Sequence, residues 1–243
     1  MPLHFSSEDF SKRLDCLKEL MSSKKLDGSL LFRQESMFYL TGYDTFGYVF
    51  FQCLYLGIDG KLILLTRLPD LRQAQQTSIL EDIRIWVDGD NVNPALKLKE
   101  ILREFGVEGK NIGVEYDSYC LTAKNGKMLD SALNGFCNLT DASNLVNSLR
   151  VEKSKDELVY VRKAAELADN ALDQAWIHTK AGVSEAKILA EMQKVVLEGG
   201  GDYPANEYII GSGHNALLCR YQAEKRELSK QDQLSIEWAG TYK

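Results

Sequence analysis

Residues 149–158 read Leu-Arg-Val-Glu-Lys-Ser-Lys-Asp-Glu-Leu, and this stretch separates two parts of the chain that differ in their sequence pattern. Ser154 and Glu157 have the spacing of a capping box, in which a serine before a helix exchanges hydrogen bonds with an acidic residue three positions later. Leucine, valine and alanine then recur on a helical period as far as Trp176. The stretch therefore predicts a long, well-capped helix near the start of a second domain.

Upstream of this helix, short apolar runs alternate with helical patterns. The predicted strands cover residues 28–32, 49–56, 61–66, 83–87 and 111–115, and a Gly-Ile-Asp-Gly turn at 57–60 joins the second to the third. The predicted helices begin at Ser6 or Ser7, near Asp70 and at Pro94. This alternation predicts a layered α/β domain with a largely parallel or mixed sheet over residues 1–143.

The downstream part has a different order of elements. Ser184 caps a second helix with an apolar face, and Gly199–Gly201 ends it. Two strands are then expected at 207–211 and 234–237. The order helix, helix, strand, strand predicts an α+β unit over residues 144–243.

Composition restricts the partners. The chain has 29 Lys and Arg against 35 Asp and Glu, a net charge of -6 and a pI near 5.3, which is the opposite of a nucleic-acid-binding surface. No apolar stretch approaches the roughly 20 residues that cross a bilayer, and no leader pattern opens the chain. Five scattered cysteines form no CxxC motif and are expected to be reduced. We expect a cytoplasmic protein that binds neither nucleic acid nor membrane.

Several motifs carry a resemblance to a known family. The stretch 149–158, with Arg162, Ala164 and Ala165 after it, resembles the start of the pita-bread domain of creatinase, prolidase and aminopeptidase P. The other matching segments are Gly182-Val183-Ser184-Glu185, Ile209-Ile210-Gly211-Ser212-Gly213 with Asn215 and Tyr221, the hairpin from Leu228 to Tyr242, and Met37-Phe38-Tyr39-Leu40-Thr41-Gly42-Tyr43, which resembles a "YLTG" element. The resemblance thus covers the whole chain.

The resemblance implies a fold and an assembly. It implies a creatinase-type N-terminal domain with a mixed sheet over 1–143, then the first part of an α+β pita-bread domain over 144–243. Relatives complete their sites with Asp, His and Glu residues from later strands, and the chain stops at Lys243. We therefore expect an incomplete catalytic half that is inactive by itself, and a homodimer, because N-terminal domains of this family pair.

One departure from the family concerns the metal. Metal-dependent relatives read approximately Ile-Asp-Ala-Gly at the strand whose Asp binds a divalent ion. Alignment on Ala239-Gly240 puts Trp238 at that ligand position and Glu237 one place earlier. Neighbouring side chains of a strand point to opposite faces, so Glu237 replaces the ligand only if the register slips. The pattern is closer to the metal-free creatinase branch or to ectoine hydrolase-like members, and we expect no cofactor.

Six residues are candidates for the site. Glu237 is a candidate base or nucleophile, with a salt-bridged or surface glutamate as the alternative. His214, in the loop after Gly213, is a candidate proton shuttle or a surface histidine. The candidates for substrate binding are Arg220, which alternatively pairs with Glu224 or Glu207, its neighbour Tyr221, and Tyr43 and Phe46 from an aromatic cluster that otherwise forms core or dimer interface.

Three functions remain open. The first is hydrolysis of a C–N bond in a small peptide or an amidine-like metabolite without a metal, with Glu237 and His214 supplying the chemistry. The second is an Xaa-Pro aminopeptidase or dipeptidase that uses a divalent metal such as Mn or Zn. The third is a non-catalytic dimerisation scaffold.

Overall fold

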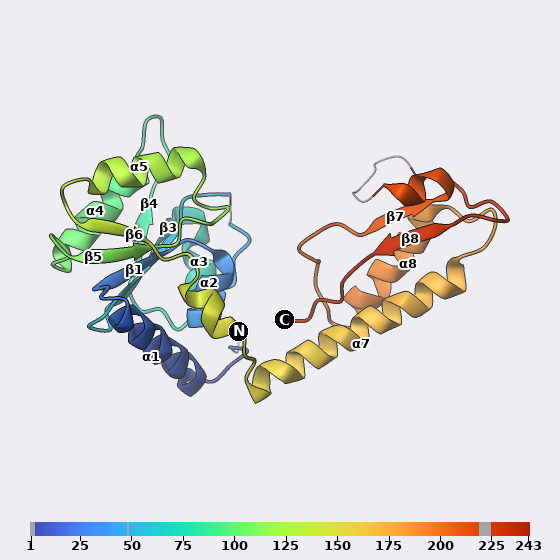
Figure 1. Ribbon diagram of the computed structural model, residues 1–243, viewed down its shortest axis with the longest axis horizontal. Helices are drawn as coiled ribbons and strands as arrows, with labels where there is room; N and C mark the ends of the chain where they lie inside the picture. Colours follow the sequence, from blue (N-terminus) through green and yellow to red (C-terminus); the bar gives the residue numbers. More distant parts are fainter. Residues whose placement is uncertain (1–2, 48, 219–224) are drawn as a thin grey trace. The chain divides into compact units, whose positions relative to one another are not determined.

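The computed structural model describes residues 3–47, 49–218 and 225–243 of the chain. These form two compact units, Met1–Glu152 and Lys153–Lys243, which are described separately (Figure 1). The first is a mixed α/β unit and the second an α+β unit, as the sequence predicts.

A six-stranded mixed sheet organises the first unit. Its strands are β1 (Gly28–Leu31), β2 (Cys53–Gly57), β3 (Leu62–Arg67), β4 (Ile83–Trp86), β5 (Asn111–Val114) and β6 (Asn138–Asp141), in the order β4-β3-β2-β1-β5-β6. The central strand β1 pairs antiparallel with β2 and parallel with β5. The hairpin β2–β3 is antiparallel, while β3–β4 and β5–β6 are parallel pairs.

Helices cover both faces of this sheet, as Figure 1 shows for α1 and for α4 with α5 on opposite sides. The helices of the unit are α1 (Ser7–Ser23), α2 (Gln34–Thr41), η1 (Leu68–Asp70), α3 (Leu71–Thr77), α4 (Pro94–Glu104), α5 (Ala123–Leu133) and α6 (Leu145–Arg150). Alternate strand residues enter two cores: Leu30 packs with α4 and α5, and its neighbour Leu31 packs with α1 and α2. Burial on both faces explains why β2 and most of β3 are continuously apolar.

Most of the elements that local sequence signals predict in the first unit are present in the structure. Ser6 caps α1 through a capping box with Asp9, and Pro94 opens α4. The apolar run predicted a strand over 49–56, but β2 begins only at Cys53, where pairing with Leu65 of β3 starts. The structure adds α2, α5, β6 and α6, which the sequence pattern did not predict.

The second unit packs two helices on one face of a small sheet. It contains α7 (Lys155–His178), α8 (Glu185–Glu198), β7 (Ile209–Ser212), η2 (Gly213–Leu217) and β8 (Leu234–Glu237). Both predicted caps are present, because Ser154 forms a capping box with Glu157 and Ser184 accepts from the N–H of Ala186. The core combines Leu167, Ala171 and Ala175 of α7 with Ile188, Met192 and Val196 of α8 and with Tyr208 and Ile210.

In the part of the chain that the structure describes, no helix combines the length and the apolar character that crossing a bilayer requires.

Candidate active site

The sheet of the second unit has one face packed on α7 and α8 and a second face that points away from these two helices. Leu234, Ile236 and Trp238 pack against the helical core, and the indole N–H of Trp238 donates to the carbonyl of Ala168 in α7 at 2.9 Å. Because side chains alternate along a strand, Ser235 and Glu237 point to the opposite face. We call this second surface the open face.

Glu237 lies on the open face at the end of β8. Its side chain is exposed, and its register partner on β7 is Ile209. Its position agrees with the strand alternation expected from the sequence, in which Trp238 and Glu237 face opposite ways.

The η2 turn, which carries His214, covers the next residue pair on this same face. That pair is Gly211 with Ser235, and the Ser235 hydroxyl donates to the carbonyl of Ala216 in η2 at 3.0 Å. A Cβ at Gly211 would overlap with the carbonyl oxygen of Asn215, so only glycine allows this approach. The turn and Glu237 are thus about two residues apart along one strand, roughly 7 Å.

His214 itself is exposed in η2. Within the described residues, no hydrogen bond or ion pair joins His214 to Glu237. Glu237 and the turn that carries His214 therefore lie on the same face of the sheet.

A buried polar network lies beneath the start of η2, and the sequence pattern did not point to it. Glu185, the first residue of α8, is 1% exposed, and its carboxylate accepts hydrogen bonds from Ser212 and Arg226. Arg226 in turn contacts Ser212 and Asp232. The Gly-Val-Ser-Glu motif signalled only a helix start, because the partners of Glu185 lie 27 and 41 residues away in sequence.

Of the four candidate substrate-binding residues, two belong to the first unit and two lie outside the described residues. Arg220 and Tyr221 lie outside the described residues. Tyr43 is fully buried in the first unit, where its hydroxyl donates to Gln52 at 2.8 Å, and burial raises its pKa. Phe46 is 82% exposed in the same unit. The substrate-binding roles of these four residues stay predictions.

The metal ligands of the family are not assembled by the described residues. Among residues 3–47, 49–218 and 225–243, no three His, Cys, Asp or Glu side chains converge so that they could hold an ion. Trp238 has no ligand atom, and its indole N–H is already engaged by α7. The described residues therefore do not fit a metal ion by themselves.

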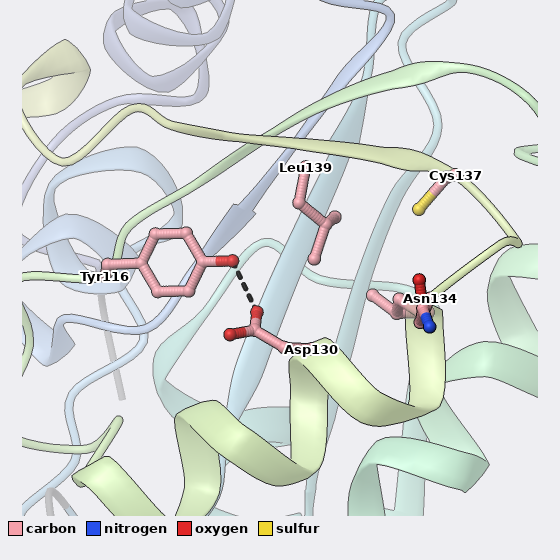
Figure 2. A pocket seen from close by; sticks show the side chains of 6 residues that line it. Tyr116, Asp130, Asn134, Cys137 and Leu139 are labelled. Atoms are coloured by element: carbon pink, nitrogen blue, oxygen red, sulfur yellow. Dashed lines mark hydrogen bonds between the residues drawn. The ribbon is translucent and has the colours of Figure 1, made fainter.

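A pocket of about 290 Å³ opens in the first unit between α5 and β6 (Figure 2). There the Tyr116 hydroxyl donates to Asp130 at 2.6 Å, and burial together with this bond raises the pKa of Tyr116. Burial raises the pKa of the Cys137 thiol to about 11. Phenol and thiol stay protonated near neutral pH, and the Asp130 carboxylate already accepts the hydrogen bond of Tyr116. The open face of the second unit, which carries Glu237 and the turn with His214, is the candidate active site.

The fold and this face together define a class of protein: a mixed α/β domain followed by an α+β unit of pita-bread type. Residues 13–151 match the Creatinase/Prolidase N-terminal domain, and residues 159–243 match Metallopeptidase family M24. The chain therefore belongs to the creatinase, prolidase and aminopeptidase P superfamily of hydrolases and peptidases.

Individual relatives agree with this assignment. Over 99% of its length the chain is 27% identical to an ectoine hydrolase from Halomonas elongata, and over 95% it is 26% identical to an Xaa-Pro dipeptidase from Pyrococcus furiosus. A prolidase crystal structure from Thermococcus sibiricus has the same fold, with a TM-score of 0.81 at 21% identity over 98% of the chain. The chain spans 64%, 61% and 63% of these three proteins, respectively.

Proposed function

We propose that the protein hydrolyses a C–N bond in a small peptide or an amidine-like metabolite without a metal, using Glu237 and His214. The observation that carries this proposal is their common location: Glu237 and the His214-bearing turn occupy adjacent positions on the open face of one small sheet. The similarity to an ectoine hydrolase over nearly the whole chain supports a small substrate.

The chemistry follows from the two side-chain types. The Glu237 carboxylate takes a proton from a water molecule, whose oxygen adds to the carbon of the scissile C–N bond. As that bond breaks, protonated His214 gives its proton to the departing nitrogen, because histidine changes its charge near neutral pH. Water supplies both the new oxygen and the protons, so no other reactant is needed.

The side-chain orientations in β8 support independence from metal. A dinuclear site needs a carboxylate at the strand position where this chain has Trp238, and two-metal sites depend on a full ligand set. Trp238 instead packs on α7. An Xaa-Pro peptidase that uses Mn or Zn is the second candidate, and the similarity to an Xaa-Pro dipeptidase favours it.

The test is a metal measurement combined with an activity assay on the full-length protein. We would determine its divalent-metal content and assay an Xaa-Pro dipeptide, creatine and ectoine before and after treatment with a chelator. Turnover that survives complete metal removal supports the proposal. Stoichiometric metal with chelator-sensitive dipeptide cleavage overturns it in favour of the peptidase, and the absence of turnover on every substrate favours the scaffold.

A further inference from the structure

We propose that Glu185 is a positioning residue, whose buried carboxylate acts with Ser212, Arg226 and Asp232 to fix the start of the η2 turn and thereby the place of His214 on the open face. We call these four residues the Glu185 network. The inference rests on the proposed function for its catalytic consequence, but the geometric claim can be measured without any activity.

The Glu185 network joins three segments that are distant in sequence: the start of α8, the end of β7 and residues 226–232. One carboxylate oxygen of Glu185 accepts from the backbone N–H of Ser212 at 2.8 Å and from its hydroxyl at 2.7 Å. The other oxygen accepts from the backbone N–H of Arg226 at 3.1 Å, while the N–H of Glu185 donates to the Arg226 carbonyl at 3.0 Å. The N-terminus of α8 is thus bonded both to the end of β7 and to the chain at residue 226.

The Arg226 guanidinium closes the network from the other side. Its Nη1 donates to the Ser212 hydroxyl at 2.7 Å and to Asp232 at 2.9 Å. Asp232 also accepts from the backbone N–H of Ser229 at 2.6 Å. The Ser212 hydroxyl therefore donates to Glu185 and accepts from Arg226, so a single oxygen connects the carboxylate with the cation.

These bonds fix the backbone immediately before His214. Ser212 is fully buried, and the next residue, Gly213, has a φ of 59°, in the left-handed region that glycine tolerates best. A Cβ at Gly213 would lie 2.7 Å from Nη1 of Arg226, so the guanidinium packs directly against this backbone. The direction in which η2 leaves β7 is thus set by the hydrogen bonds of Ser212 and by the packing of Arg226 against Gly213.

Because Glu185 and Ser212 are buried, the Glu185 network is sensitive to the loss of any one partner. Removing one partner leaves a buried polar group without its hydrogen bond, which costs more than the bond itself contributes. The backbone around Gly213 would then relax, and small displacements of a catalytic group reduce rates by as much as about a hundredfold. Glu185 itself touches no substrate in this scheme.

The first unit provides a matched control. Glu115 is also 1% exposed, and it accepts from the backbone N–H groups of Phe32 and Arg33 and from the hydroxyl of Ser36, which is fully buried. Glu115→Gln and Ser36→Ala therefore remove the same kinds of contact as Glu185→Gln and Ser212→Ala, but far along the chain from His214.

The experiment observes the His214 ring by NMR in the full-length protein. The chain has three histidines, so a His214→Asn spectrum assigns the signal directly. We expect Ser212→Ala to move the His214 ring signals and their pH titration midpoint, and Glu185→Gln to move them less, because a glutamine still accepts from Ser212. Glu115→Gln and Ser36→Ala should leave these signals unchanged.

Steady-state kinetics give the second measurement. If the proposed function is right, Ser212→Ala lowers kcat by about tenfold or more with KM changed less than about twofold. His214 signals that are unchanged in both Ser212→Ala and Glu185→Gln overturn the inference. If Ser212→Ala does not fold, Glu185→Gln decides alone. Absence of hydrolysis in the wild type refutes the proposed function and leaves the NMR result decisive for the Glu185 network.

Discussion

Glu115 and Glu185 are buried carboxylates that accept hydrogen bonds from backbone N–H groups. Each replaces water as the acceptor for N–H groups at an element boundary, which satisfies donors that would otherwise be buried without a partner. Glu115 does this for the start of α2, where Phe32 and Arg33 donate to it at 2.9 and 2.7 Å. Burial raises the pKa of Glu115, while its hydrogen bonds act in the opposite direction.

The raised pKa of Glu115 gives a pH dependence with a definite sign. A carboxyl group whose pKa is higher in the folded state contributes stability below its unfolded value of about 4.5, and this contribution is lost as the pH rises through the folded value. We expect the free energy of unfolding of wild type, relative to that of Glu115→Gln, to fall as the pH rises from about 4.5 through the raised pKa of Glu115. Urea unfolding of both proteins between pH 4 and 7 measures it.

The control for this prediction is Glu108→Gln, which changes an exposed glutamate of the same unit. It should follow the wild-type pH profile. A constant difference between wild type and Glu115→Gln at every pH would contradict the prediction.

Glu237 is the residue on which the proposed chemistry depends most. Glu237→Gln keeps the size of the side chain and removes its ability to take a proton, so we expect kcat to fall by about 10²- to 10⁴-fold with little change in KM. Glu198→Gln alters an exposed glutamate at the end of α8 in the same unit and should retain activity. Activity within twofold of wild type for Glu237→Gln would remove Glu237 from the mechanism.

At the scale of elements, the capping box of α7 is a local device with a measurable contribution. Ser154 accepts from the N–H of Glu157 at 3.2 Å, and Glu157 accepts from the N–H of Ser154 at 2.7 Å. We expect Ser154→Ala to destabilise the second unit by about 1 kcal/mol, the usual effect of losing a serine cap. Thermal or urea unfolding in a background with Trp86 and Trp176 replaced by phenylalanine, so that the fluorescence reports Trp238, measures this loss.

A serine in the last turn of a helix, away from any N-cap, provides the comparison. Ser131 is exposed in α5, where alanine has the higher helix propensity, so Ser131→Ala should be neutral or slightly stabilising. Equal effects of the two substitutions would mean that the cap contributes nothing.

At the scale of the molecule, the chain passes from the first compact unit to the second between Glu152 and Lys153. Residues 151–154 are all exposed. Exposed connections between compact units are preferred sites of proteolysis. Limited trypsin digestion should therefore cut first at Arg150, Lys153 or Lys155 and produce two fragments, which mass spectrometry identifies. Early cuts within α4, for example at Lys99, would contradict this view of the units.

The sequence by itself determined the elements whose signals are local. The helix start at Ser6 or Ser7, the capping box at Ser154 and the proline at position 94 were sufficient to predict α1, α7 and α4, because helical hydrogen bonds join residues three or four positions apart. Most strands were predicted from short apolar runs between turn signals. The alternation of side chains along a strand predicted that Trp238 and Glu237 face opposite ways. The family motifs added the order of the two domains.

Only the tertiary structure decided which residues act together. The N–H groups at the start of α2 donate to Glu115, 83 residues away, so no local pattern predicts that short helix. Likewise, the buried glutamate at the start of α8 reads in the sequence as an ordinary helix start, and Gly211 reads only as the last residue of a predicted strand. Folding brings α8, β7 and residues 226–232 together, because buried polar groups must find partners wherever the chain supplies them.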